Sequence, residues 1–181
     1  MDVAHDTEAA LISAADLINT AGDPDTLSTL DELATFYREQ GWTGLRRGDT
    51  EELEQVRGLR PRLRDLWVAE VEELVEGVNG LLRDAQALPQ IVRHDDHDWH
   101  LHATQQDQPL ATRMAVEAAM ALVDVIRMGE TGRLRVCAAP DCDDVFMDLS
   151  RNRSRRFSHV TCSNRVAAAA YRSRQSEQDG E

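Results

Sequence analysis

The sequence has no lysine, and all twenty of its basic residues are arginine. Aromatic residues are also scarce, at 4% of 181 residues. A hydrophobic core must therefore be built from Leu, Val, Ile and Ala, which favours helices. Hydrophobic residues still make up 41% of the chain, which argues against global disorder. The length fits one medium domain, or one domain with a small added module.

Cysteine is rare too, with three residues in the chain. A secreted disulfide framework normally has an even number of cysteines and follows a signal peptide. The first residues, MDVAHDTEAALISAADL, are acidic and lack the basic start of such a peptide. The stretch MAVEAAMALVDVI is interrupted by Glu117 and Asp124, and it is shorter than the roughly 20 residues of a membrane span. We therefore expect a cytoplasmic protein with reduced thiols and no membrane contact.

Charge is distributed unevenly along the chain, whose formal net charge is -13. Residues 1–132 carry 11 Arg and 26 acidic residues, whereas residues 133–174 carry nine Arg and four Asp. The acidic part would repel a phosphate backbone and the basic part could attract one. Both could equally be solvated surfaces. The fork of donors on each arginine suits phosphate or guanine.

Apolar periodicity predicts four helices in the first 85 residues. They cover 7–20, a segment from Asp25 to about Gly41, a segment starting at Thr50, and 67–85. Asp25 and Thr50 are the expected N-caps of the second and third helices, and Pro61 should kink or split the third near Arg60. The residues expected to face inward are Leu11, Ala15, Ile18, Leu27, Leu30, Ala34, Tyr37, Leu53, Val56, Leu59, Leu63, Leu66, Val71, Leu74, Val78, Leu81 and Leu82.

The apolar spacing shortens to two near residue 99, which predicts a small β-hairpin with its turn near residues 95–98. Trp99, Leu101 and Ala103 would face inward. A long helix should follow from about Pro109 to Met128, with its apolar face formed by Met114, Ala118, Leu122 and Ile126.

The same hairpin is rich in histidine and aspartate, so it could bind a metal ion. A metal-dependent hydrolase is one hypothesis for these side chains. However, Asp and His are at home in a turn and on a solvated strand face, and no HExxH-type motif accompanies them. We favour a solvated hairpin and no enzyme. The histidines concerned are His94, His97, His100 and His102.

The segment CAAPDCDDVFMDLSRNRSRRFSHVTCSNR holds all three cysteines. Cys137 and Cys142 have the spacing of a zinc knuckle, and thiolates are strong zinc ligands. The fifteen residues 143–157 leave room for two short strands, in which Val145 and Met147 alternate with Phe146 and Asp148. VAAAAYRSR then predicts a helix. Composition alone leaves a zinc site and buried free cysteines as comparable interpretations.

These motifs, C-x4-C, then F-x-D-x-S-R-N-R-S-R-R-F, then C-x-N-R before a basic Ala-rich helix, resemble the CGNR zinc-finger family. ADLINT, DTLSTLDELATFYREQG and VRGLRPRLRDL, with the hairpin and long helix, resemble the ABATE domain that precedes this finger, described as a stress-induced transcription regulator. The resemblance implies a mainly α (α+β) fold. A helical ABATE-like domain (1–132) with a small hairpin, for sensing or dimerisation, precedes a ββα finger (133–174) and a disordered tail (175–181).

The resemblance also implies zinc ligands at Cys137, Cys142 and Cys162. The family has a fourth cysteine directly after the aromatic residue, but here Ser158 follows Phe157. Either Ser158 replaces that cysteine or the cysteine is deleted. His159 is spaced to reach the same ion, and three thiolates with one imidazole form a known structural set. We favour a structural zinc ion with His159 as its fourth ligand. The alternative is a degenerate finger that is held together by packing alone.

A zinc ion would order the most basic part of the chain beside the last helix. The start of that helix favours phosphate, and Asn and Arg side chains can read adenine and guanine. Asn164 and Arg165 could instead brace the finger by pairing with Asp143, Asp144 or Asp148. The candidate nucleic-acid contacts are Arg151, Arg153, Arg155, Arg156, Asn164, Arg165, Arg172 and Arg174.

These expectations lead to two main functional hypotheses. The first is a DNA-binding transcription regulator, acting as a homodimer because paired half-sites raise affinity, with a small-molecule effector bound by its N-terminal domain. The second is a protein-interaction module whose finger docks on an acidic partner or packs on the body of the same chain.

Overall fold

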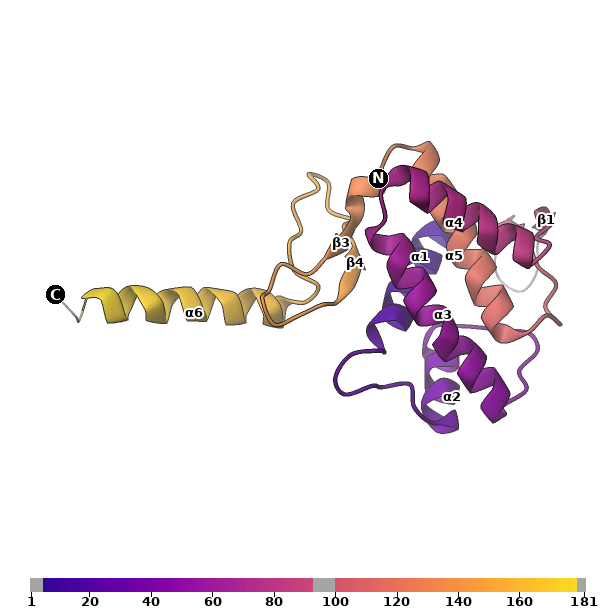
Figure 1. The fold of residues 1–181 in the computed structure, drawn as a ribbon, viewed down its shortest axis with the longest axis horizontal. Coiled ribbons are helices and arrows are strands. Elements are labelled where there is room, and N and C mark those ends of the chain that lie inside the picture. The colour runs from indigo at the N-terminus through magenta and orange to yellow at the C-terminus, as the bar shows by residue number, and fades with distance from the viewer. Residues whose placement is uncertain (1–4, 93–99, 179–181) are drawn as a thin grey trace.

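The computed structural model describes residues 5–92 and 100–178. These residues form six α-helices and two small antiparallel sheets, which confirms a mainly α fold followed by a ββα module (Figure 1). The helices are α1 (His5–Asn19), α2 (Leu30–Glu39), α3 (Thr50–Val68), α4 (Val71–Asp84), α5 (Leu110–Arg127) and α6 (Val160–Gln178). The strands are β1 (Gln90–Val92), β2 (His100–His102), β3 (Leu134–Val136) and β4 (Val145–Met147), and a 3-10 turn (Thr131–Arg133) precedes β3.

Helix α5 is the centre of the helical body, because α1, α3 and α4 all pack against it. The buried face of α5 includes several alanines, whose small size lets the neighbouring helices approach closely. The expected apolar faces of α3 and α5 are confirmed at nearly every position. The buried residues among those predicted are Leu11, Ala15, Ile18, Leu27, Leu53, Val56, Leu59, Leu63, Leu66, Leu74, Val78, Leu81, Met114, Ala118 and Leu122.

The predicted caps of α2 and α3 are wrong. Helix α2 begins after Thr29, whose hydroxyl accepts from the backbone N–H of Glu32 while the Glu32 carboxylate accepts from the backbone N–H of Thr29. This reciprocal capping box outcompetes a cap at Asp25. Leu30 and Val71, the first residues of α2 and α4, are exposed rather than inward. Asp49, not Thr50, caps α3.

Asp25 instead pairs with the buried Arg60 of α3, with its two carboxylate oxygens 2.8 and 3.0 Å from the guanidinium nitrogens. The predicted split at Pro61 is also wrong, because α3 is continuous through it. Proline cannot donate to the carbonyl four residues earlier. Here the Arg60 Nε lies 3.4 Å from that carbonyl of Arg57 and takes the place of the missing donor.

The first hairpin pairs β1 with β2, with Ile91 opposite Leu101. Ala103 is buried as expected, but Leu101 is exposed, contrary to the prediction. No described helix packs extensively on this two-stranded sheet, which leaves its apolar side chains in solvent. Trp99 and the expected turn lie outside the described residues.

The second hairpin, β3–β4, is joined tightly to the helical body. Val145 and Met147 belong to the same hydrophobic core as α1, α3 and α5. Asn19 at the end of α1 bonds the backbone of Val145 in both directions: its Nδ2 donates to the carbonyl at 2.9 Å, and its Oδ1 accepts from the N–H at 2.8 Å. Trp67 and Arg64 of α3 donate to the carbonyls of Arg135 and Asp143. The finger is therefore anchored through its strands.

Two expectations for this hairpin are wrong. The strand that pairs with β4 lies before Cys137, not within residues 143–157. Burial does not alternate along 145–148, because Phe146 and Asp148 are buried as well as Val145 and Met147. The Arg155 guanidinium covers the Phe146 ring at 4.7 Å from its centre, and this contact buries the face that we expected to meet solvent.

Helix α6 extends away from the rest of the molecule, with the β3–β4 hairpin between it and the helical body (Figure 1). The helix begins at Val160 and continues to Gln178, into the segment 175–181 that we expected to be a disordered tail. Among the described helices, none is long and apolar enough to cross a membrane.

We predict that Asn19→Ala destabilises the protein by about 2 kcal/mol, because it leaves the buried N–H and C=O of Val145 without partners. Urea denaturation followed by circular dichroism measures this loss. Asn79→Ala is the matched control, since Asn79 is exposed on α4, and it should change stability by less than about 0.5 kcal/mol. Equal effects of the two substitutions would refute the anchoring role of Asn19.

Candidate metal centre and arginine surface

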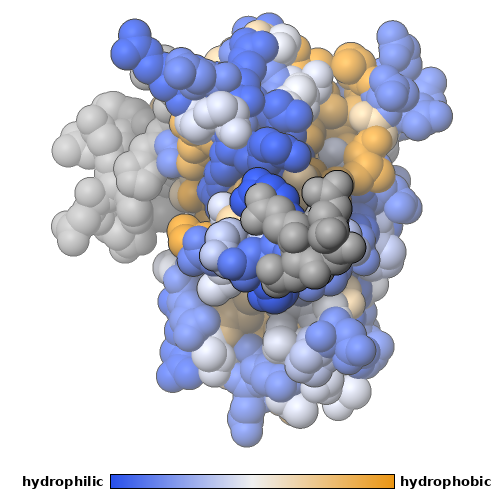
Figure 2. All heavy atoms as spheres, turned by 90° about the vertical axis from the view of Figure 1, so that its left-hand side faces the viewer, coloured by the Kyte–Doolittle hydropathy of each residue, from blue (hydrophilic) through white to orange (hydrophobic). Residues whose placement is uncertain are grey.

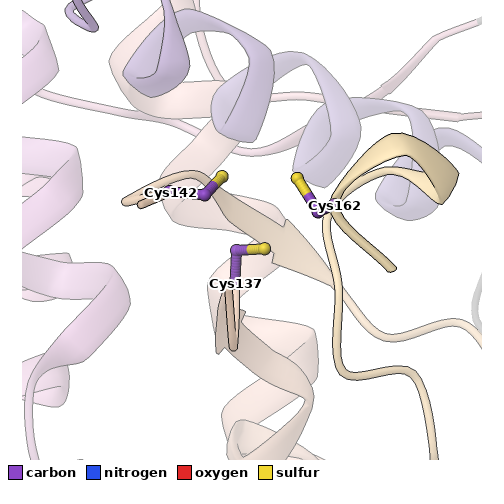
Figure 3. Close-up of side chains that lie close together, drawn as sticks. All are labelled: Cys137, Cys142 and Cys162. Carbon is purple, nitrogen blue, oxygen red and sulfur yellow. The ribbon is translucent and has the colours of Figure 1, made fainter. Parts of the chain in front are cut away.

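Three cysteine side chains from separate segments meet at the start of α6. Cys137 follows β3, Cys142 lies in the turn before β4, and Cys162 is in the first turn of α6. Their sulfur atoms lie within 4.8 Å of one another and point toward a common centre (Figure 3). Cys137 and Cys162 are buried, and Cys142 is half-buried. The structure thus brings together the three thiols that the sequence predicted as ligands.

Backbone N–H groups from the turns around the cluster donate to these sulfurs. The Ala139 N–H lies within hydrogen-bonding reach of the Cys137 sulfur, and the Asp144 N–H does the same for Cys142. The Ser158 N–H donates to Cys137 at 3.4 Å. These bonds stabilise negative charge on sulfur, the form in which cysteine binds a metal ion.

The thiol pKa values show that the cluster does not hold three thiolates unaided. Burial raises the pKa of Cys137, but hydrogen bonds from Ser158 outweigh that effect and lower it to about 7. Burial raises the pKa of Cys142 to about 12, above its usual range. One thiolate near another disfavours the second by charge repulsion. A cation at the centre would remove this penalty.

The chemistry of this donor set fits zinc. In a tetrahedral zinc site with Zn–S bonds of about 2.3 Å, neighbouring sulfurs lie about 3.8 Å apart. The three sulfurs here lie within 4.8 Å of one another, so they are near enough to share one ion. Among the described residues, no other group of three or more His, Cys, Asp or Glu side chains converges in this way. His100 and His102 lie on β2, and His94 and His97 lie outside the described residues.

The two residues considered for the fourth position lie in different surroundings. The hydroxyl of Ser158 is buried and lies 3.6 Å from the Cys142 sulfur and 3.7 Å from the Cys162 sulfur. His159 is outside the thiol group. Its side chain is 68% exposed, and its Nε2 lies 3.7 Å from a carboxylate oxygen of Asp144.

The candidate arginines divide into two groups. The side chains of the first group are exposed but are bonded to other groups of the same protein. Arg165 forms two bonds to Asp141, at 2.7 and 2.9 Å, and also lies 3.7 Å from the Cys162 sulfur. Bracing therefore takes place, although through a different aspartate from the three expected. Arg153 pairs with Glu130 at 2.8 Å. Arg155 donates to the carbonyls of Phe157 and Ser158 while covering Phe146.

The second group points into solvent and has no carboxylate partner among the described residues. The guanidinium of Arg156 lies over the Phe157 ring, 5.7 Å from the ring centre. Asn164 is exposed near the start of α6. Figure 2, which views the molecule from the side on which α6 projects, shows that hydrophilic residues predominate around this end. The exposed arginines of this group, without an ion-pair partner among the described side chains, are Arg151, Arg156, Arg172 and Arg174.

Sequence reasoning missed the buried residue that orders the arginine loop (residues 150–156). Asp148 is fully buried and accepts from the N–H and the hydroxyl of Ser150 and from the N–H of Arg155. Arg133, also buried, donates to the carbonyls of Asp148 and Ser150. A D-x-S pattern before an Arg-rich loop is a signal that could have identified this turn.

Comparison with protein families agrees with this architecture. The model of the ABATE family, described as "Putative stress-induced transcription regulator", matches residues 13–129, and the CGNR zinc-finger model matches residues 133–175. The chain belongs to the ABATE family and carries a C-terminal CGNR zinc finger. Both are regulator or zinc-finger families rather than enzyme families. No curated protein matches the chain.

We predict that the purified protein contains one zinc ion per chain, and that Cys162→Ser loses it because a thiolate ligand is removed. Native mass spectrometry of both proteins measures the metal content. Ser163→Ala, at the next residue of α6, is the control and should keep the ion. Zinc retained in Cys162→Ser but lost when His100 and His102 are replaced by alanine would instead support the histidine site.

We also predict that Asp148 makes stability depend on pH. Burial raises its pKa, but the bonds from Ser150 and Arg155 outweigh this and hold the pKa below its usual value. A carboxyl group whose pKa is lowered in the folded state stabilises the protein above the unfolded value of about 3.9, and this stabilisation is lost as the pH falls through the lower, folded-state pKa. Asp148→Asn should therefore be less stable at neutral pH and decline less between about pH 5 and 3.

Urea midpoints measured across this pH range test the effect of Asp148. Asp65→Asn is the control, since Asp65 is exposed on α3. If Asp148→Asn and Asp65→Asn have the same stability at every pH, the carboxylate of Asp148 does not order the loop.

Proposed function

We propose that this protein is a cytoplasmic transcription regulator that binds duplex DNA through its C-terminal module. In this proposal a structural zinc ion bound by Cys137, Cys142 and Cys162 fixes the start of α6. The arginine loop (residues 150–156) and the outer part of α6 then contact the DNA. The proposal rests on one observation above all, the exposure of α6 around its whole circumference.

Helix α6 is anchored only by its first turns. Cys162 is buried and Val166 packs against the cysteine cluster, but every residue from 167 to 175 is exposed. A short helix in water is marginally stable by itself, so a helix exposed on all sides is suited to ordering against a partner. An α-helix is about 10–12 Å across with its side chains, and the major groove of DNA is about 12 Å wide.

The arginines that have no carboxylate partner among the described residues favour DNA as that partner. Arg172 and Arg174 lie on the outer part of α6, and Arg151 and Arg156 lie on the arginine loop, so two separate segments offer cations at the same end of the molecule. Phosphate contacts of this kind supply affinity without sequence preference. Asn164, exposed near the start of α6, is the best placed residue for base recognition. The acidic helical body would be held away from the phosphates.

A second candidate function is protein interaction, and the anchoring of β3–β4 on the helical body favours it in part. That contact uses Val145, Met147 and the backbone of the hairpin. It leaves the arginine loop and α6 free, so an acidic protein could bind there in place of DNA. The homodimer and the small-molecule effector remain predictions.

We predict that replacing Arg151 and Arg156 together by alanine weakens binding to duplex DNA. It should also reduce the slope of log K against log salt by about 2, one for each lost phosphate contact. Replacing Arg172 and Arg174 should have a similar effect. Fluorescence anisotropy of a labelled duplex, titrated at several salt concentrations, measures both quantities.

The matched control replaces Arg83 and Arg127, two exposed arginines of the helical body, and changes the net charge by the same amount. It should leave the salt slope unchanged. Wild-type protein that contains zinc but binds no duplex DNA, or binds it without salt dependence, would refute the proposed function. Capture of an acidic protein by the same arginines would then support the second candidate.

A further inference from the structure

We propose that Ser158 supplies the fourth ligand of the metal centre through its hydroxyl oxygen, while the hydroxyl donates a hydrogen bond to Asp144. This inference rests on the proposed zinc site, but it does not depend on DNA binding. It assigns the position for which the sequence suggested His159, and it concerns residues in which this chain departs from the pattern of four cysteines.

The first argument is distance. A zinc ion with Zn–S bonds of about 2.3 Å and a Zn–O bond of about 2.0–2.2 Å has sulfur–oxygen edges of about 3.5 Å. The Ser158 oxygen lies 3.6 Å from the Cys142 sulfur and 3.7 Å from the Cys162 sulfur. Its backbone N–H bonds the third sulfur, that of Cys137, at 3.4 Å. The oxygen therefore lies close to the fourth corner of a tetrahedron.

The second argument is the hydrogen-bond partner of the oxygen. A neutral hydroxyl is a poor zinc ligand by itself. Here the Ser158 hydroxyl donates to a carboxylate oxygen of Asp144 at 3.0 Å. Donation to a carboxylate increases negative charge on the ligand oxygen and fixes its orientation, as outer partners do for other metal ligands. The proton is directed toward Asp144, so a lone pair of the oxygen is free to face the ion.

The third argument is the position of His159. Its ring is largely exposed, and its Nε2 lies 3.7 Å from the same carboxylate oxygen of Asp144 that accepts from the Ser158 hydroxyl. His159 therefore lies outside the thiol group, whereas Ser158 is buried directly among the sulfurs.

A serine ligand has a consequence for the basic end of the molecule. Zinc with three thiolates and a neutral hydroxyl carries a net charge of about −1, compared with about −2 for four thiolates. The centre lies at the start of α6, where the partial positive charge of the helix balances a small negative charge. The exposed arginines nearby are then opposed by less negative charge.

Cobalt binding tests the assignment, because Co²⁺ replaces zinc in such sites and its sulfur-to-metal absorption grows with the number of thiolates. Ser158→Cys should raise that absorption by about one third, from three thiolates to four. It should also lower the zinc dissociation constant, measured by competition with a chromophoric chelator, on the order of tenfold. Ser158→Ala should raise that constant by a similar factor.

Two controls separate a ligand from a neighbour. Ser163→Cys adds a thiol beside Cys162 without placing it at the fourth corner, and it should not change the absorption. His159→Ala should change the zinc dissociation constant by less than about twofold. Because Ser158 variants could fail to fold, X-ray absorption at the zinc edge of the wild-type protein provides an independent readout. It should show three sulfurs and one light atom, without the outer-shell scattering of an imidazole ring.

The proposal is overturned by imidazole scattering together with a tenfold loss of zinc affinity in His159→Ala. It is also overturned if Ser158→Cys leaves the thiolate count at three, or if the wild-type protein binds no zinc. None of these measurements involves DNA, so failure of the ligand assignment and failure of the proposed function are distinguished.

Discussion

The convergence of three thiols at the start of α6 is the constraint on which the C-terminal module depends. Cys137 and Cys142 come from the hairpin side and Cys162 from the helix, so these side chains decide where α6 begins and in which direction it leaves the molecule. The cluster is small, with Ala139, Phe157 and Val166 as its apolar neighbours. So little buried apolar surface contributes only a few kcal/mol, whereas zinc binding by thiolates contributes on the order of ten.

The helical body provides the second anchor. Val145 and Met147 are part of its core, and Asn19 at the end of α1 bonds the backbone N–H and C=O of Val145. These contacts hold the strands of the finger against the body. The metal centre is thus fixed on one side by the body and directs α6 on the other. Buried hydrogen bonds of Asp148 and Arg133 hold the arginine loop, which lies between β4 and α6 in the sequence.

The sequence predicted the parts of the fold that local patterns determine. Leu and Val at helical spacing identified the inner faces of α3 and α5, and the resemblance of the cysteine motif to the CGNR zinc finger identified the thiol cluster. What it could not predict depends on tertiary contacts. Asp25 could cap a helix as well as Thr29 until Arg60 is known to lie beside it. Ser158 and His159 are adjacent in sequence, and only the backbone bend before α6 shows which one is turned toward the sulfurs. The division of the arginines into those paired within the protein and those without a carboxylate partner among the described residues likewise required the positions of Asp141 and Glu130.

Metal and nucleic-acid binding are linked in this account, because the ion orders the arginines that contact DNA. The most direct test titrates a labelled DNA duplex with the zinc-loaded protein, with the same protein after removal of zinc by a chelator, and again after zinc is restored. We predict salt-dependent binding by the loaded protein, a loss of binding on the order of tenfold or more without zinc, and full recovery when zinc returns. Equal DNA binding with and without zinc would contradict the account.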